Sequence, residues 1–446
     1  MNTPICDFVR EYARSEKLRL HMPGHKGVSL IGMEALDITE VKGADSLYEA
    51  EGIIAQSEAN AGRLFGCRTF YSTEGSSQCI RAMLYLLMQR AKQLGREPVL
   101  AAGRNAHKTF LTAAALLDMD VQWLYSREGG YLSCELSAHE IDAYLSKAVK
   151  KPFALYLTSP DYLGHVADIE AIAEVCHRHE VYLAVDNAHG AYLRFLPRSL
   201  HPIDLGADIC CDSAHKTLPA LTGAAYLHLS GDMDRALGPQ VKNAMMVFGS
   251  TSPSYLIMQS LDAVNAYLES YPQRLRAYLD GLEALKEGLI EQGYSLHGNE
   301  PLKLTIDAKA YGYSGVSMAD YLRSLDIEAE FADPDHIVLM LTPEKGSDGL
   351  QRIKDALIKL PKKDKIPETA PALIPGQPLM SIRSAMFSES EVLPVEDCVG
   401  RVLAVPTVGC PPAVPILMCG EKVTEHAIAC FRYYGITQCC VVKKSG

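Results

Sequence analysis

The chain has 446 residues, of which 48% are hydrophobic and 22% charged, and its formal net charge at pH 7 is −11. The negative charge argues against a nucleic acid as partner, because phosphate backbones are bound by clustered lysine and arginine. It is compatible with a small cationic substrate. A chain of this length exceeds what one hydrophobic core usually serves, so we expect two or three domains.

The N-terminus and the cysteines predict a cytoplasmic protein without a membrane partner. Asp7, Arg10 and Glu11 stand where a signal peptide would have an apolar run, and no stretch approaches the roughly 20 apolar residues of a membrane span. The 13 cysteines form no CxxC pair, so we expect reduced thiols and neither disulfides nor structural zinc. The segment EVCHRHE (174–180) is interpreted as an amphipathic helix with its histidines on the polar face, in preference to a metal site.

From about residue 65 to 230 the sequence alternates short apolar runs with helical patterns. The six predicted strands are 98–102, 121–125, 153–158, 181–186, 208–212 and 224–229. Helices lie between several of them, including one that starts near Ser77 and stops at Gly95. This alternation predicts an α/β fold with a mostly parallel sheet covered on both faces. Ligands of such sheets bind at the carboxyl ends of the strands.

The remainder of the chain predicts further domains. Residues 255–292 are expected to be helical throughout, and a second α/β pattern follows from about residue 301. Five prolines between 360 and 378 indicate a linker, and residues 416–435 are predicted to form strand, turn and helix of a small α+β module. The predicted boundaries are 1–60 for an N-terminal segment, 61–290 for a large cofactor-binding domain, 291–360 for a small α/β domain, 361–378 for the linker and 379–446 for the C-terminal module.

Lys216 and Asp186 are the residues from which a function can be inferred. Asp186 ends one predicted strand, and Lys216 follows the end of the next, within CDSAHKTLPALTG (211–223). A carboxylate and a lysine at neighbouring strand ends are what a pyridoxal phosphate site needs, because the lysine bonds the aldehyde and the carboxylate keeps the ring nitrogen protonated. Taken singly, the two residues are better interpreted as a helix cap and a solvated loop lysine, but their order and spacing favour the cofactor.

Two further stretches fit the same cofactor. Gly75, Ser76 and Ser77 in STEGSSQC (72–79) begin a strong helix, where backbone N–H groups and hydroxyls can bind a phosphate; serine is also an ordinary helix cap. His107 follows the strand 98–102 and is a candidate to stack on the ring, although a single histidine is more often structural.

The ordered set of motifs resembles the ornithine/lysine/arginine decarboxylase family, in its short bacterial form without an N-terminal wing domain. The motifs are LHMPGHKG, DITEVKGADSLYEAEG, EGSSQ, RNAHKT, DNAHGAYLRF, SAHKTLPALTG, STSPSYLIMQSLDA and GCPPAVPILMCGE. The resemblance implies an aspartate aminotransferase-like, fold type I enzyme that acts as a homodimer or larger homo-oligomer, with residues 1–60 at the active-site entrance and the dimer interface. It implies decarboxylation of a basic amino acid to an amine and CO2 in polyamine-type metabolism, with arginine expected before lysine or ornithine.

The resemblance also implies roles for individual residues. Lys216 would form the Schiff base with pyridoxal phosphate, Asp186 would hold the ring nitrogen, and His107 and Ala188 would lie against the two faces of the ring. The residues implied for the phosphate are Gly75, Ser76, Ser77, Gln78, Ser213 and His215, with Ser252 reaching the phosphate of the neighbouring subunit. The residues implied for the substrate are His25, Lys26, His189 and Glu421. Either Lys216 or His215 would protonate the product.

The sequence departs from the family pattern at a few positions. Asn187 and Tyr192 replace a glutamate and a histidine, Thr73-Glu74 stands where an asparagine is common, and Ala413 replaces a glycine. Two alternatives therefore stay open: a fold type I aminotransferase or other pyridoxal phosphate lyase, and a cofactor-binding protein without decarboxylase activity. No arginine in the matched motifs is suited to clamp a substrate carboxylate, which disfavours the aminotransferase.

Overall fold

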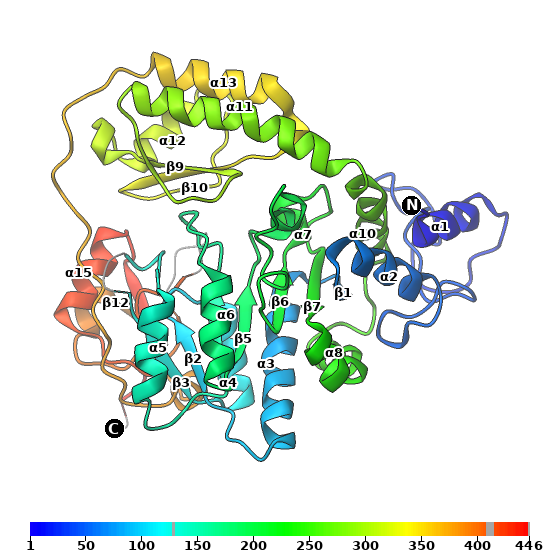
Figure 1. Ribbon diagram of the computed structural model, residues 1–446, viewed down its shortest axis with the longest axis horizontal. Helices are drawn as coiled ribbons and strands as arrows, with labels where there is room; N and C mark the ends of the chain where they lie inside the picture. Colours follow the sequence, from blue (N-terminus) through cyan, green and yellow to red (C-terminus); the bar gives the residue numbers. More distant parts are fainter. Residues whose placement is uncertain (127–129, 407–413, 445–446) are drawn as a thin grey trace. The chain divides into compact units, whose positions relative to one another are not determined.

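The structure is a computed structural model that describes residues 1–446 except 127–129, 407–413 and 445–446 (Figure 1). The chain forms two compact units, each made of separate segments. The first comprises Met1–Pro98 and Ile169–Arg274, and the second Val99–Asp168 and Leu275–Gly446. The boundaries predicted for five domains stay a prediction.

The first unit contains four strands of a seven-stranded sheet, in the order β1-β7-β6-β5. Their bounds are Arg68–Ser72 for β1, Tyr182–Asp186 for β5, Ile209–Asp212 for β6 and Ala225–Leu229 for β7. Strands β5 and β6 are parallel, whereas β7 is antiparallel to both β1 and β6. Nearly all their residues are buried, as expected for a sheet covered on both faces.

Helices surround these strands. They are α1 (Pro4–Arg14), α2 (Ile53–Phe65), α3 (Gly75–Gln93), α6 (Ile169–Arg178), α7 (Ala214–Thr217), α8 (Gly231–Leu237), α9 (Val241–Val247) and α10 (Tyr255–Leu268). A buried carboxylate joins three of them, because Asp262 of α10 accepts hydrogen bonds from the N–H groups of Ile5 (3.0 Å) and Cys6 (2.9 Å) and from Ser57 Oγ (2.6 Å). It thereby satisfies N–H groups in the first turn of α1, which have no partner within the helix.

The second unit contains the other three strands of the seven-stranded sheet, in the order β4-β2-β3, all parallel. Their bounds are Leu100–Gly103 for β2, Val121–Leu124 for β3 and Ala154–Thr158 for β4, and the helices α4 (Lys108–Leu117) and α5 (Ala138–Lys147) accompany them. Helix α5 begins with a capping box formed by Ser137 and Glu140.

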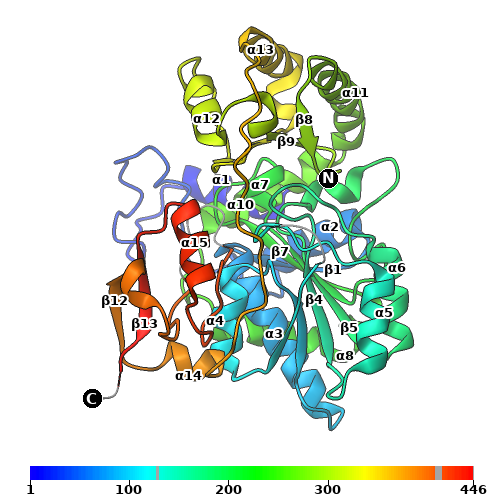
Figure 2. The ribbon, with the colours of Figure 1, turned by 90° about the vertical axis from the view of Figure 1, so that its left-hand side faces the viewer.

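Two smaller sheets complete the second unit (Figure 2). The first is antiparallel and consists of β10 (Phe331–Ala332), β11 (His336–Met340), β9 (Lys303–Asp307) and β8 (Ser295–His297). Three helices accompany it: α11 (Tyr271–Glu291), α12 (Gly315–Arg323) and α13 (Gly346–Lys359). Helix α11 begins in the first unit. The second pairs β12 (Ser390–Pro394) with β13 (Gln438–Val442), with α14 (Ile382–Met386) and α15 (Glu425–Tyr433) nearby in the chain.

The six predicted strands and the helix α3 are confirmed. Residues 361–377 contain neither helix nor strand, and the role of 361–378 as a linker stays a prediction. Strand β1 was not predicted. The helix predicted for 255–292 is in fact two helices, because Pro272 has no N–H to continue the hydrogen-bond ladder of α10. No helix in the described part of the chain has both the length and the hydropathy that a membrane span requires.

The strand predicted at the start of 416–435 is wrong. Residues 416–419 are buried but irregular, and the helix that follows them is α15. Their backbone is bonded by side chains rather than by a neighbouring strand: Arg104 donates to the carbonyls of Pro415 (2.9 Å) and Ile416 (2.7 Å), and Glu421 accepts from the N–H of Met418 (2.8 Å). A short apolar run indicates burial, but it does not by itself distinguish a strand from an irregular segment.

Candidate active site

Lys216 lies one turn beyond the carboxyl end of β6. The strand ends at Asp212, Ser213 precedes the single turn of α7, and Lys216 N–H donates to Ser213 O at 3.1 Å. The Lys216 side chain is half-buried, and its Nζ lies 3.0 Å from Nε2 of His189, which is 6% exposed. His189 belongs to the loop after β5, so residues that follow neighbouring strands meet at the lysine amine.

Asp186 is the last residue of β5 and pairs in register with Cys211 of β6. It is 3% exposed. Its Oδ1 accepts hydrogen bonds from the N–H of Ala188 at 3.2 Å and from Cys211 Sγ at 3.7 Å. Burial raises the pKa of the Cys211 thiol well above its usual range, so the thiol keeps its proton and acts as donor. The carboxylate is therefore fixed at the strand end. Asp186 and Lys216 follow the ends of two adjacent parallel strands, as the sequence predicts.

The start of α3 is joined to the lysine segment. Ser213 Oγ donates to Ser76 Oγ at 2.9 Å. Gly75, the first residue of α3, has φ +70°, and a Cβ built on it would have no atom within 4 Å. A backbone with open space and with first-turn N–H groups that lack intrahelical partners can approach an anion closely. Ser76, Ser77 and Ser213 therefore lie around a position suited to a phosphate.

Gln78 and Glu74 tie this helix start to other segments. The Gln78 amide accepts from Ser72 Oγ (2.6 Å) and donates to Tyr48 Oη (2.8 Å) and to the carbonyl of Met245 (2.9 Å). The side chain of Gln78 is thus engaged with protein groups, and its predicted role toward the phosphate now depends on its backbone. Glu74, one of the departures from the family pattern, accepts a hydrogen bond from the N–H of Ser250.

His215 is held with one ring nitrogen toward the backbone. Its Nδ1 lies 2.8 Å from Ala224 O, so Nδ1–H donates to this carbonyl. Burial, reinforced by the charge of Lys216, lowers the pKa of His215. At neutral pH the ring is therefore uncharged, with the lone pair on Nε2.

Other residues with predicted roles lie in the first unit. Ala188 is buried directly after Asp186, whereas Ser252 is exposed. His25 Nδ1 accepts from the N–H of Gly27 at 2.9 Å, and its Nε2 lies 3.3 Å from Asp37 Oδ2. Lys26 has φ +56° and donates to the carbonyl of His21. Their predicted roles stay predictions.

Two predicted site residues belong to the second unit. His107 is the N-cap of α4: its Nδ1 accepts from the N–H of Thr109 at 3.1 Å, which leaves the proton of the neutral ring on Nε2. Glu421 is 4% exposed, and burial raises its pKa, opposed by the charge of Arg104. Two roles stay predictions: the stacking of His107 on the ring of pyridoxal phosphate and the contact of Glu421 with the substrate. Ala413 lies outside the described residues.

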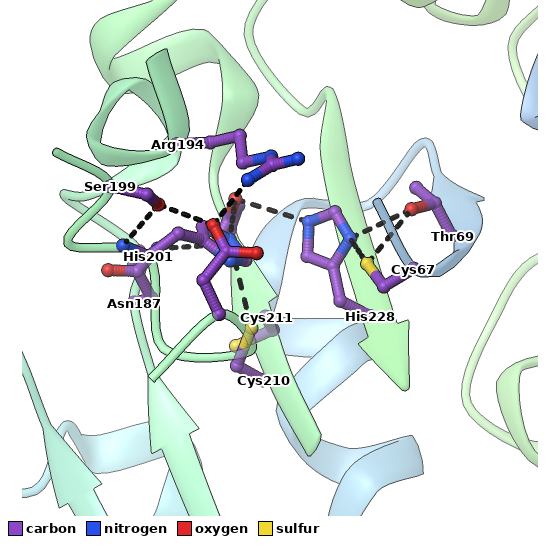
Figure 3. Close-up of polar contacts among 12 residues, drawn as sticks. Cys67, Thr69, Asn187, Arg194, Ser199, His201, Cys210, Cys211 and His228 are labelled. Atoms are coloured by element: carbon purple, nitrogen blue, oxygen red, sulfur yellow. Dashed lines mark hydrogen bonds and ion pairs between the residues drawn. The ribbon is translucent and has the colours of Figure 1, made fainter. Parts of the chain in front are cut away.

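A buried polar network around Asp212, the residue before Ser213 in the lysine segment, was not predicted (Figure 3). Its centre is Asp212, whose Oδ2 lies 3.2 Å from His201 Nε2 and 3.1 Å from His228 Nε2, and whose Oδ1 accepts from Asn187 Nδ2 at 2.7 Å. Asp212, His201 and His228 are 0% exposed at their side chains. On the other side His228 Nδ1 meets Thr69 Oγ1 at 2.9 Å. Despite burial, the two histidines hold the pKa of Asp212 well below its usual range, so the carboxylate is charged.

This network connects the ends of β5 and β6. Asn187 follows Asp186 directly, and Asp212 precedes the lysine segment. Asn187, which the sequence marks only as a departure from a pattern, supplies a neutral donor to a buried carboxylate. The signal in the sequence was Asp212 itself, a carboxylate at the end of a buried strand, which has to find partners.

The parallel strands with a lysine and a buried aspartate at adjacent ends, beside a serine-rich helix start, define a fold type I pyridoxal phosphate enzyme. Family models agree: the major domain of the Orn/Lys/Arg decarboxylases matches residues 3–287, and their C-terminal domain matches 370–442. The chain therefore belongs to the Orn/Lys/Arg decarboxylase family, whose members depend on pyridoxal phosphate.

Named relatives have the same overall extent. The chain is 28% identical to an arginine decarboxylase of Bacillus subtilis, over 96% of this chain and 92% of that one. It is 30% identical to an arginine decarboxylase of Halalkalibacterium halodurans, over 96% of this chain and 93% of that one. A solved lysine decarboxylase of Francisella novicida has a TM-score of 0.80 at 16% identity, over 99% of this chain and 81% of that one. An alanine–glyoxylate aminotransferase from Nostoc has a TM-score of 0.53 at 18% identity, over 68% of this chain and 86% of that one, so the fold extends beyond decarboxylases.

The residues of the first unit fit the cofactor. A phosphate would lie at the hydroxyls of Ser76 and Ser213, beside Gly75, where no Cβ intrudes and whose N–H donates to Gly223 O at 2.7 Å. An aldehyde would be held by the amine of Lys216. The protonated ring nitrogen would meet Asp186, whose Oδ1 is oriented by the N–H of Ala188 and the thiol of Cys211.

Proposed function

We propose that this protein decarboxylates arginine to the corresponding amine and CO2, with lysine and then ornithine as the next substrates in preference. The placement of Lys216 and Asp186 after adjacent parallel strands supports the cofactor chemistry. Relatives named arginine decarboxylase, at 28% and 30% identity over nearly the whole chain, support the substrate.

Bound pyridoxal phosphate withdraws electrons into its protonated ring and so stabilises the negative charge that departing CO2 leaves behind. Asp186 keeps the ring nitrogen protonated, because a buried carboxylate next to a cation strongly favours the charged pair. Lys216 holds the aldehyde, and His189, 3.0 Å from its amine, positions the lysine. Ser76, Ser77 and Ser213 hold the phosphate, and the first turn of α3 adds backbone N–H groups.

Lys216 is the better of the two candidates for protonating the product. His215 is neutral at physiological pH and gives its Nδ1 proton to Ala224 O, so it has no proton to deliver from Nε2. The amine of Lys216 carries transferable protons once the substrate has taken its place. His215 instead packs beside the lysine and, as a neutral ring with an open Nε2, can accept a hydrogen bond.

The protein acts as a homodimer in the cytoplasm, with residues 18–31 in the interface. Leu18, Leu20, Leu30 and Ile31 are between 81% and 83% exposed in the single chain. Four large aliphatic side chains so fully exposed within one segment are typical of a protein–protein contact. Ser252, which is also exposed, then reaches the phosphate site of the second copy.

A substrate panel tests this function. The purified protein is loaded with pyridoxal phosphate, and the release of CO2 and amine is measured with arginine, lysine and ornithine. We expect arginine to give the highest kcat/KM. Conversion of the bound cofactor to its amine form with a keto acid product would instead identify an aminotransferase. Cofactor absorbance without any turnover would identify a binding protein.

A further inference from the structure

We propose that the second unit contains a binding site for a divalent metal ion, formed by Asp333, Asp335 and His336 at the turn between β10 and β11. One ligand atom of each residue lies within 4.8 Å of those of the other two. The three residues line a cavity of about 290 Å3, formed by residues of the second unit alone. Lys216 and the other residues assigned here to the cofactor do not line it.

Two buried side-chain atoms of this turn, one in Asp333 and one in His336, lack hydrogen-bond partners among the described residues. Asp333 is 6% exposed, and its Oδ2 has no hydrogen-bond partner among the described residues; nor has the buried Nδ1 of His336. Leaving a buried acceptor unsatisfied costs about 1–3 kcal/mol, and more for a charged group. Nδ1 of His336 lies 3.7 Å from Asp333 Oδ1, so one ion could bind to both side chains and relieve both deficits.

The turn is fixed before any ion binds. Asp333 Oδ1 accepts from the N–H groups of Asp335 (2.8 Å) and His336 (2.6 Å), which sets the direction of Oδ2. Gly315 of α12 packs so closely on the turn that a Cβ there would lie 1.9 Å from His336 O. Asp335 is oriented by Lys309, whose Nζ is 3.1 Å from Oδ1, and by the hydroxyl of Tyr433. A preorganised set of ligands loses little entropy on binding.

The charge of the cavity suits a divalent cation. Its lining contains four carboxylates, from Asp307, Asp333, Asp335 and Glu368, and two lysines, Lys309 and Lys365, which leaves two negative charges in excess. The ring of His297 lies against His336, with the two ring centroids 5.0 Å apart. Two carboxylates and an imidazole are ligands for Mn2+ and Zn2+, with water completing the coordination.

Mn2+ is the better probe, because the thiols of this cysteine-rich chain would also bind Zn2+. The full-length protein loaded with pyridoxal phosphate is stripped of metal and titrated with Mn2+, and free Mn2+ is followed by electron paramagnetic resonance. We expect one bound ion per chain. Asp333→Asn keeps the Oδ1 acceptor of the turn, and His336→Phe keeps the ring beside His297; each should weaken binding about tenfold or more.

Two controls make the result specific. Asp307→Asn removes a carboxylate from the same cavity outside the three-residue cluster, and should change the affinity much less than Asp333→Asn. Lys309→Gln removes the cation that competes for Asp335, and should strengthen binding. The proposal is overturned if the wild-type protein retains no Mn2+ at millimolar concentration, or if His336→Phe and Asp333→Asn bind as the wild type does. The proposal would also be overturned, in favour of a site for an organic cation, if Mn2+ did not bind but agmatine, the amine that decarboxylation of arginine gives, stabilised the protein against unfolding.

Discussion

The side-chain amide of Asn187 donates a 2.7 Å hydrogen bond to Oδ1 of Asp212 and thereby joins the ends of β5 and β6. Both side chains are fully buried. Because Asn187 follows Asp186 and Asp212 precedes the segment of Lys216, this bond fixes the two strand ends that carry the proposed cofactor contacts. A hydrogen-bond donor is required here, since Asp212 is charged, and a carboxylate in place of Asn187 could not supply one.

Asn187→Asp should therefore destabilise the protein by about 3 kcal/mol or more, because it places two carboxylates in contact without water. Asn187→Ala, which removes the donor but adds no charge, should cost about 1–3 kcal/mol. Urea denaturation at one protein concentration compares the two variants, and equilibrium binding of pyridoxal phosphate reports on the strand ends. Equal stability of the two variants would show that Asp212 is not a buried anion.

His228 and His177 should affect the pH dependence of stability in opposite directions. Burial lowers the pKa of His228 in the folded protein, despite the attraction of Asp212. The stability that His228 contributes is therefore fully present above the unfolded pKa of about 6.5, and it is lost as pH falls below that value. The hydrogen bond to Asp208 raises the pKa of His177 in the folded protein. The stability that His177 contributes is therefore present at low pH, and it is lost as pH rises through this folded-state pKa.

We expect His228→Gln to reduce the loss of stability between about pH 7 and 5, and His177→Gln to increase it. The free energy of unfolding, measured in urea at several pH values, gives the slope for each variant. Parallel slopes for the wild type and both variants would contradict the assigned directions.

Arg104 should be essential for the stability of the second unit. It is 2% exposed and donates to two buried carbonyls, those of Pro415 and Ile416. Arg104→Met should cost about 2–4 kcal/mol, because two charge-assisted hydrogen bonds are lost and the carbonyls stay buried. Arg383→Met is the matched control: Arg383 also donates to two carbonyls, of Ala115 and Leu116, but it is exposed. Thermal unfolding should show a much smaller effect for the control than for Arg104→Met.

The exposed aliphatic segment gives a test of the dimer. Leu30 and Ile31 are 82% and 83% exposed, and Leu30→Asp with Ile31→Asp should dissociate the protein into monomers, because charge cannot be buried in an apolar contact without a partner. Light scattering after size exclusion measures the mass. Val149→Asp, at an apolar residue that is fully exposed in the second unit, should leave the mass unchanged. An unaltered dimer in the double variant would remove residues 18–31 from the interface.

Much of the fold follows from local pattern. Strands β2 to β7 are apolar runs between turn residues, all of them buried except β3, which is mostly half-buried, and α3 has one apolar face, so each was predictable by itself. Strand β1, with the sequence RTFYS, is short and polar at both ends, and only its antiparallel pairing with β7 makes it a strand. Residues 416–419 are as apolar as a strand, but Arg104, over 300 positions away, bonds the adjoining backbone.

The candidate site was predictable to the extent that chain order determines it. Asp186 ends one predicted strand and Lys216 follows four residues after the end of the next, so their placement at one sheet edge follows from topology. The network around Asp212 was not predictable in this way, because Thr69, His201 and His228 come from separate elements and meet only through tertiary packing. The engagement of the Gln78 amide with Tyr48 and Met245 likewise depends on contacts between distant segments.

The bond between Lys216 and the cofactor is tested most directly by peptide mass spectrometry. The protein is loaded with pyridoxal phosphate, reduced with borohydride and digested, and the modified lysine is located in the peptide that contains residues 213–217. The account predicts one phosphopyridoxyl group per chain, on Lys216, and none on that peptide in Lys216→Ala. A modified lysine elsewhere in the wild-type chain, with residue 216 unmodified, would contradict it.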